Sequence, residues 1–170
     1  MPTLETDRLR LRPFAQDLSD VAAMERVLGD PVSMRWYPAP FDREATLRWV
    51  QRWLDRYETD GFGLLVMEDR RTSEVVGDCG PAVMDVDGEA MVELGWHVLR
   101  ARQGQGLATE AGAACRDWAF ASLGAPFLIS LIRPENVASR RVAEKLGFGI
   151  WRGTIRAAWG HLVYRLDRPR

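Results

Sequence analysis

Residues 102–111 read RQGQGLATEA, and this stretch guides the interpretation of the whole chain. Gly104 and Gly106 stand directly before Leu-Ala-Thr-Glu-Ala, a run that favours a helix. The first N–H groups of a helix have no partner within it and carry its partial positive charge, so uncrowded backbone there can hold a phosphate. A tight turn that needs a positive φ is the alternative explanation for the two glycines. The surrounding sequence has to distinguish between them.

Length and composition are those of one globular domain. The chain has 170 residues, of which 46% are hydrophobic and 28% charged, so we expect a single domain over residues 1–170. The net charge of −1 gives no electrostatic reason to expect a nucleic acid or an anionic membrane as partner.

The chain start and the cysteines indicate the compartment. The opening MPTLETDRLRLRPF lacks the apolar core of a signal peptide, and no apolar run is long enough to span a bilayer. Cys79 and Cys115 have neither a CxxC nor a metal-ligand spacing, so we expect free thiols and no metal. These features favour a cytoplasmic protein.

Hydrophobic periodicity predicts an α+β domain around a mixed sheet of about seven strands flanked by four helices. Asp17 and Asp42 are expected to cap the first two helices, which cover residues 18–28 and 43 to about 61. The remaining helices are expected at 107–123 and 138–146. The expected strands cover residues 8–14, 63–68, 74–84, 90–99, 126–132, 148–156 and 161–166, with those at 63–99 forming an antiparallel meander.

Two common phosphate-binding motifs do not fit the glycine stretch. A P-loop would need Lys and Ser or Thr after its second glycine, where Leu107 and Ala108 stand. A dinucleotide-binding fingerprint would need a third glycine at Thr109 and a parallel βαβ unit, whereas the preceding strand belongs to a meander. A nicotinamide oxidoreductase that uses Gly104 and Gly106 therefore stays an alternative, which NAD binding would test.

A different pattern fits completely, because Gln103, Gly106 and Ala108 match Q/R-x-x-G-x-G/A. With this motif the sequence resembles the GNAT superfamily of acetyl-CoA-dependent N-acetyltransferases. Other segments, in the same order along nearly the whole chain, resemble its ribosomal-protein N-acetyltransferase-like branch. These segments are LETDRLRLRPF at 4–14, ELGW at 93–96, PENVAS at 134–139 and EKLGF at 144–148.

The resemblance implies a GNAT fold with acetyl-CoA as cosubstrate. The strand at 90–99 would carry a bulge and splay from the strand at 126–132, with the pantetheine arm of CoA in the gap. Arg102 would add charge at the rim, and Asn136 would contact the cofactor, although asparagine is equally suited to cap a helix. Backbone groups along the gap would come from Val98, Leu99 and Arg100, and the pyrophosphate would lie against Gln103, Gly104, Gln105, Gly106, Leu107, Ala108 and Thr109.

The resemblance also implies catalytic residues. Glu93 stands where the family usually has a carboxylate that deprotonates the amine through water, and His97, on the same strand face, is a second candidate. Many members protonate the leaving thiolate with a tyrosine, but Ala143 occupies that position. Ser139 is the acid that the branch suggests, and an ordinary serine at a helix start is the alternative. His161 is given no role.

The resulting hypothesis is an N-acetyltransferase. It would transfer the acetyl group of acetyl-CoA to a primary amine, either a protein N-terminal α-amine or a small-molecule amine, by direct attack in a ternary complex. The alternative is a non-catalytic acyl-CoA-binding module, a hypothesis that Ala143 keeps open. The loop at 34–41 and the helix that follows it are expected to form the acceptor wall, and a homodimer is compatible with the resemblance.

Overall fold

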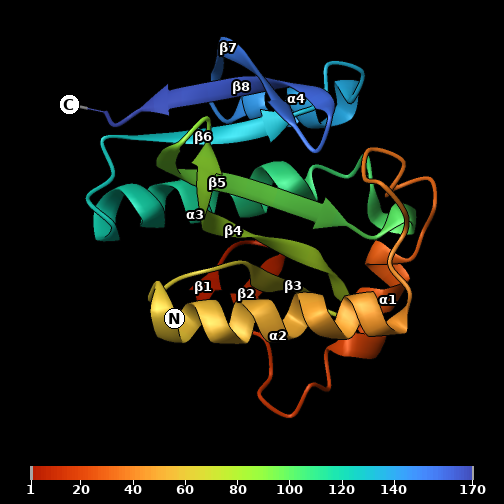
Figure 1. The fold of residues 1–170 in the computed structure, drawn as a ribbon. Helices are drawn as coiled ribbons and strands as arrows, with labels where there is room; N and C mark the ends of the chain where they lie inside the picture. The colour runs from red at the N-terminus through yellow and green to blue at the C-terminus, as the bar shows by residue number, and fades with distance from the viewer. Residues whose placement is uncertain (1, 170) are drawn as a thin grey trace.

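The computed structural model describes residues 2–169 and contains one mixed eight-stranded sheet with helices on both faces (Figure 1). The strand order is β1-β2-β3-β4-β5-β6-β8-β7, with β5 and β6 parallel and every other neighbouring pair antiparallel. The strands are β1 (Leu4–Glu5), β2 (Leu9–Arg12), β3 (Leu65–Asp69), β4 (Val75–Val86), β5 (Glu89–Val98), β6 (Phe127–Ile132), β7 (Gly149–Arg156) and β8 (Trp159–Asp167). The helices are α1 (Val21–Leu28), α2 (Arg43–Thr59), α3 (Leu107–Ser122) and α4 (Val137–Lys145), with a short 3₁₀ helix at Arg100–Arg102.

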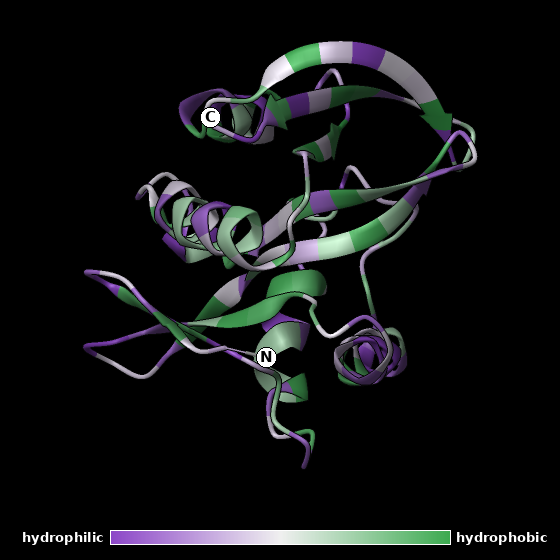
Figure 2. Cartoon of the chain, turned by 90° about the vertical axis from the view of Figure 1, so that its left-hand side faces the viewer, coloured by the Kyte–Doolittle hydropathy of each residue, from purple (hydrophilic) through white to green (hydrophobic). Residues whose placement is uncertain are grey.

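The sheet separates two hydrophobic layers. Figure 2 views α2 and α3 nearly end-on, on opposite sides of the strands. On one side, Ala111 and Cys115 of α3 pack in a fully buried cluster with Leu94 of β5. On the other side, Val50 and Leu54 of α2 belong to a second cluster with side chains of α1 and β3. Because side chains alternate along a strand, each inner strand contributes to both layers.

The strands β5 and β6 form the opening that matters for function. A single residue pair, Glu93 with Ile129, joins them, so they diverge toward their carboxyl ends and leave backbone groups facing the gap. The expected splay is therefore present. The expected bulge in this strand is not found within residues 2–169, because β5 pairs with β4 without interruption from Val98 to Glu89.

The first helix begins later than the sequence predicted. α1 starts at Val21, because Leu18 lies at φ +61°, outside the helical region. The carboxylate of Asp17 accepts from the backbone N–H of Ser19 (3.0 Å), and within residues 2–169 no hydrogen bond joins it to α1, so the prediction that it caps this helix is wrong. The prediction for α2 is confirmed, since the Asp42 carboxylate accepts from Ala45 N–H at 2.7 Å.

The predicted α+β class, the four helices and the antiparallel meander are confirmed. The sheet has one strand more than expected because the two-residue β1 was too short for a period to be recognised. The insertion of β8 between β6 and β7 also had no sequence pattern to predict it. Cys79 and Cys115 are free and buried, as expected. No helix within residues 2–169 is long and apolar enough to cross a membrane.

Candidate active site

The glycine stretch forms the turn that leads into α3. Gly104 and Gly106 have φ values of +76° and +81°, a region that side chains rarely adopt, so the turn itself requires glycine. Space in front of the loop is open, since a Cβ added at Gly104 would meet no atom of residues 2–169 within 4 Å. One added at Gly106 would meet only a guanidinium nitrogen of Arg8, at 3.5 Å. The turn explanation and the ligand explanation therefore apply together.

The backbone of this loop presents a row of donors. Within residues 2–169, no acceptor is found for the N–H groups of residues 104–109. The first N–H group to be bonded in α3 is that of Glu110, which donates to Gly106 O at 3.0 Å. Donors at the positive end of a helix are the usual protein site for a phosphate, so this geometry fits the pyrophosphate of CoA.

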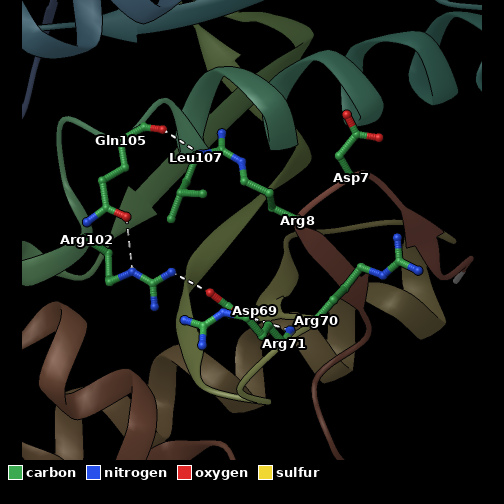
Figure 3. Close-up of a pocket in the computed structure, with 8 residues that line it drawn as sticks. All are labelled: Asp7, Arg8, Asp69, Arg70, Arg71, Arg102, Gln105 and Leu107. Atoms are coloured by element: carbon green, nitrogen blue, oxygen red, sulfur yellow. Dashed lines mark hydrogen bonds and ion pairs between the residues drawn. The ribbon is translucent and has the colours of Figure 1, made fainter.

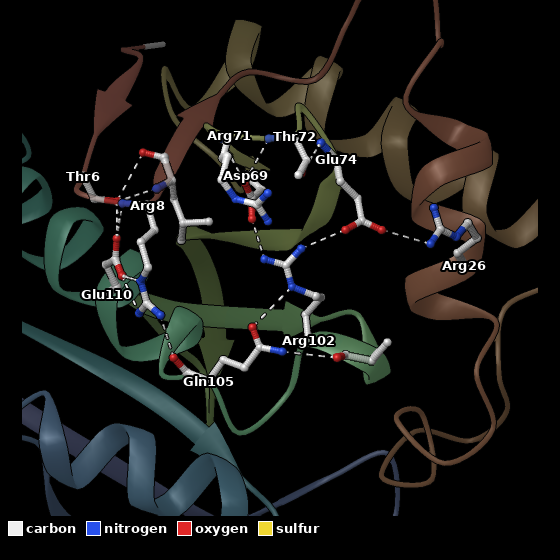
Figure 4. A network of polar contacts seen from close by, with 12 residues as sticks. Thr6, Arg8, Arg26, Asp69, Arg71, Thr72, Glu74, Arg102, Gln105 and Glu110 are labelled. Carbon is white, nitrogen blue, oxygen red and sulfur yellow. Dashed lines mark hydrogen bonds and ion pairs between the residues drawn. The ribbon is translucent and has the colours of Figure 1, made fainter.

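Arg102 fastens the loop to the β3–β4 hairpin (Figure 4). Its guanidinium binds Asp69 at 2.5 Å and Glu74 at 2.8 Å, and its Nε donates to the side chain of Gln105. The Arg102 hydrogen bond holds the pKa of Asp69 at about 2. Both carboxylates engage this cation, so it positions the loop, contrary to the expectation that it adds free charge at the rim.

Arg8 fastens the other end of the loop. Its Nε donates to Glu110 on α3 at 2.6 Å, and its Nη1 donates to the carbonyl of Gln105 at 2.9 Å. Beside these contacts lies a cavity of about 600 Å³ (Figure 3). Arg8 and Arg102, which line this cavity, are paired with carboxylates, and these ion pairs hold the loop in shape. Its lining consists of Asp7, Arg8, Asp69, Arg70, Arg71, Arg102, Gln105 and Leu107.

The end of β5 offers fewer free backbone groups than expected. Leu99 N–H donates to Val76 O, and Leu99 O accepts from Arg102 N–H, both at 2.8 Å, so this residue has no backbone group left for a cofactor. Since Leu99 N–H points toward β4, the N–H of Val98 points toward the gap. The side chain of Gln103 donates to Val98 O and to Ser33 Oγ, both at 3.0 Å, and so joins β5 to the loop before α2.

Asn136 and Ser139 lie together at the start of α4. Asn136 Oδ1 accepts from Ser139 N–H at 3.2 Å, so the helix-capping role is confirmed. The Ser139 side chain is half-buried, and no partner for its hydroxyl is found within residues 2–169. Ala143 is fully buried in the cluster under α4. A hydroxyl available for proton transfer at this end of α4 is therefore that of Ser139.

Glu93 lies at the point where β5 and β6 part. Its Oε1 accepts from Leu131 N–H on β6 at 3.1 Å, so the carboxylate spans the two strands. Burial raises the pKa of Glu93, which the Leu131 hydrogen bond only partly offsets. Leu94 belongs to the α3-side cluster, so Glu93 and His97 share the opposite face, on the side of α1 and α2.

His97 is held at both ring nitrogens. Its Nδ1 lies 2.7 Å from Asp78 Oδ1 on β4, and its Nε2 lies 2.7 Å from the hydroxyl of Tyr37, which precedes α2. The other Asp78 oxygen accepts from the indole N–H of Trp49 at 3.0 Å. Burial lowers the pKa of His97, but the charge and hydrogen bond of Asp78 outweigh it and raise the pKa above its usual value.

Asp78, Tyr37 and Trp49 were not singled out from the sequence as a group, because they come from segments far apart in the chain. The expectation that the loop at 34–41 and the next helix face the acceptor was the only indication of two of them. His161 bonds the carbonyl of Trp159 on its own strand at 2.9 Å and joins none of these groups. Within residues 2–169 no cluster of His, Cys, Asp and Glu is suited to hold a metal ion.

Comparison with known proteins identifies the family to which the chain belongs. Residues 8–149 match the acetyltransferase (GNAT) domain. The uncharacterized protein YkkB of Bacillus subtilis (strain 168) is 37% identical over 145 residues, 85% of this chain and 83% of that protein. A crystal structure of an acetyltransferase from Agrobacterium tumefaciens str. C58 is 33% identical, with a TM-score of 0.84 over 98% of this chain and 95% of that one.

A putative ribosomal-protein-serine acetyltransferase from Vibrio cholerae shares the fold at 20% identity, with a TM-score of 0.80 over 98% of this chain and 97% of that one. Fold and site together define an acyltransferase that uses acetyl-CoA. The chain belongs to the GNAT acetyltransferase family, as its motifs predicted.

Proposed function

We propose that the protein transfers the acetyl group of acetyl-CoA to a primary amine by direct attack in a ternary complex. The observation that carries the proposal is the gap between β5 and β6, which both sides of the sheet can reach. The donor loop at residues 104–109 precedes α3 on one face, whereas Glu93 lies on the face of α1 and α2. A thioester and an amine approaching from opposite faces would meet there.

The cofactor half of the proposal uses backbone. The N–H groups of residues 104–109, including those of Gln105, Leu107, Ala108 and Thr109, would hold the pyrophosphate. The pantetheine arm would lie along β5, where the N–H groups of Val98 and Arg100 remain for it, since Arg100 O already accepts from Gln103 N–H. Asn136 would contact the arm from the start of α4. A donor from β5 would also polarise the thioester carbonyl, where negative charge develops during attack.

The acceptor half uses side chains. An aliphatic amine is largely protonated at neutral pH and attacks only as the free base, so a proton must leave first. Glu93, whose burial raises its pKa, would take this proton through an ordered water. The amine nitrogen then bonds to the acetyl carbon, the C–S bond breaks, and Ser139 would supply the proton that the departing thiolate needs.

The acceptor itself is proposed as a protein N-terminal α-amine or a small-molecule amine. The name of the Vibrio cholerae neighbour, a putative ribosomal-protein-serine acetyltransferase, makes ribosomal-protein N-terminal peptides the first acceptors to test. A homodimer, a cytoplasmic location and a single domain over residues 1–170 stay predictions.

The test is an amine panel incubated with the protein and acetyl-CoA, with release of CoA and acetylation of the amine both measured. With at least one acceptor we expect amine-dependent release of CoA, with one molecule of CoA released for each molecule of amine acetylated. CoA binding without turnover on any amine would instead favour the non-catalytic acyl-CoA-binding module. Stabilisation by NAD but not by CoA would favour the oxidoreductase alternative.

A further inference from the structure

Four side chains from four separate segments form a continuous hydrogen-bonded chain on the acceptor face. Trp49 of α2 donates to Asp78 of β4, Asp78 bonds His97 of β5, and His97 bonds Tyr37 in the loop between α1 and α2. Asp78 is completely buried and the side chain of His97 is 13% exposed, whereas Tyr37 is 37% exposed. Tyr37 is therefore the most exposed of the four residues, since Trp49 is only partly exposed.

The chemistry of these groups fixes the direction of each hydrogen bond. An indole N–H only donates and an ionised carboxylate only accepts, so Asp78 accepts hydrogen bonds from both Trp49 and His97. A neutral imidazole that donates from Nδ1 must accept at Nε2. Tyr37 then donates its O–H to His97, and the lone pairs of its oxygen are left for a group outside the chain.

The Tyr37 hydroxyl bonds His97, which lies on the same face of β5 as the proposed base Glu93. The pKa of Tyr37 is raised by burial of its hydroxyl and by the negative charges of Glu93 and Asp78, and Arg156 in the β7–β8 hairpin acts in the opposite sense. A primary amine near Glu93 has N–H donors, and its nitrogen lone pair is needed for the attack on the thioester. A phenol oxygen with free lone pairs suits such a donor.

We propose that Tyr37 binds and orients the acceptor nitrogen by accepting one of its N–H groups, with the polarity of the phenol set by His97 and Asp78. The inference rests on the proposed function for the identity of the acceptor as an amine. It assigns His97 and Asp78 as positioning residues that act through Tyr37. It leaves proton removal to Glu93, since neither ring nitrogen of His97 is free to face the amine.

The arrangement makes amine binding dependent on pH. When His97 is protonated, its Nε2 donates a hydrogen bond to the Tyr37 oxygen, and the phenol O–H turns outward. An ammonium group has no lone pair, so it cannot accept a hydrogen bond from this O–H. The charged groups that act on this histidine are Asp78 and Glu93, with Arg156 acting on Tyr37 and Glu93. Burial lowers the pKa of His97, but Asp78 raises it by more. The reversal of the hydrogen bond therefore lies above the ordinary histidine pKa of about 6.5.

Tyr37→Phe is the test, because it removes only the hydroxyl from a partly exposed ring. We expect the KM for the amine to rise about two- to tenfold at a pH where His97 is neutral, the range for one hydrogen bond. The KM for acetyl-CoA and the kcat at saturating amine should stay unchanged. The rise should vanish at low pH, where the wild-type phenol has turned outward. His97→Gln should raise the amine KM as well, and His161→Gln, at the unlinked histidine, should not.

Direct titration of the CoA complex with the tightest-binding amine of the panel provides a readout without turnover. Weaker amine binding by Tyr37→Phe at high pH supports the inference even if no acetyl transfer is found, so the two proposals fail separately. Equal amine affinity for Tyr37→Phe and wild type at high pH would overturn it. A rise in KM that is the same at every pH would also overturn it, because simple packing by the hydroxyl would then account for the loss.

Discussion

The two sides of the β5–β6 gap achieve binding by different means. On the α3 side, the donors are consecutive backbone N–H groups of residues 104–109, held in place by Arg8 and Arg102. On the α1 and α2 side, the polar groups are side chains such as Glu93 and Tyr37, brought together from distant segments. The first arrangement suits a ligand common to a whole family, and the second allows each chain to choose its own acceptor.

The comparison predicts that a backbone change on the α3 side has the largest effect. Gly106→Val should remove the stabilisation by CoA, with affinity lowered at least about a hundredfold, while the fold without ligand survives. A β-branched residue at φ +81° forces the loop away from its shape, and several donors lose their alignment together. Thermal unfolding with and without CoA measures this effect.

Gly124→Val is the matched control for this prediction. Gly124 lies just beyond the other end of α3 at φ +64°, also with no atom within 4 Å of an added Cβ, so the backbone strain is comparable. It should lower the melting temperature of the protein without reducing the shift that CoA induces. If both variants respond to CoA as the wild type does, the loop does not hold the phosphates.

On the acceptor side, Glu93→Gln should produce the next largest effect. We expect kcat/KM for the amine to fall by roughly a hundredfold or more, the range of general base catalysis, at pH values above the raised pKa of Glu93 and well below that of the amine. The loss should shrink as the pH approaches the pKa of the amine, because the free base then arrives already deprotonated. Steady-state kinetics across pH measure this trend.

The pH trend of Glu93→Gln is opposite to that of Tyr37→Phe. The rise in the amine KM caused by Tyr37→Phe should be largest at high pH, where His97 is neutral. This opposition separates proton removal from amine orientation. If Glu93→Gln loses nothing at any pH while His97→Ala shows the loss at low pH, the imidazole is the base and the assignment of Glu93 is wrong.

Ser139→Ala tests whether Ser139 protonates the departing thiolate of CoA. It should lower kcat by roughly ten- to a hundredfold with acetyl-CoA affinity little changed. Among residues 2–169 the Ser139 hydroxyl has no structural partner, and the hydrogen bond to Asn136 uses the Ser139 backbone N–H. Pre-steady-state kinetics would establish that chemistry limits the rate. An unchanged kcat under those conditions would leave Ser139 as a helix-start residue only.

The smallest effect is expected at the supports of the loop. Arg102→Gln keeps a polar side chain but loses the ion pairs with Asp69 and Glu74, so CoA affinity should fall only a few fold. The depressed pKa of Asp69, about 2, keeps this carboxylate ionised down to that value, so the pair persists at ordinary assay pH and is lost only on strong acidification. A few-fold change that is constant between pH 5 and 8 is the expected result of titrating CoA.

The same contrast explains what the sequence could and could not predict. The glycine loop, the helix after it and the cap by Asn136 depend on residues adjacent in the chain, so local patterns were enough. The fastening role of Arg102 and the use of both Leu99 backbone groups depend on neighbours in β3 and β4, which no local pattern specifies.

The hydrogen-bonded chain from Trp49 to Tyr37 could not be predicted from the sequence for the same reason. Its members are separated by up to 60 positions, and the bond between Tyr37 and His97 exists only because the loop before α2 folds back over β5. The resemblance to the family singled out Glu93 on β5. Its hydrogen bond to Leu131 depends on how β5 and β6 diverge, which the sequence does not specify.

Titration of CoA into Gly106→Val and Glu93→Gln, followed by turnover of the same two samples, tests whether the loop binds the cofactor and Glu93 serves the acceptor. We expect Gly106→Val to lose CoA binding, whereas Glu93→Gln should bind CoA with wild-type affinity and lose turnover at pH values between the pKa of Glu93 and that of the amine. Wild-type CoA affinity in Gly106→Val, or an equal loss of CoA affinity in both variants, would contradict a cofactor site built from the loop backbone and an acceptor site built from side chains.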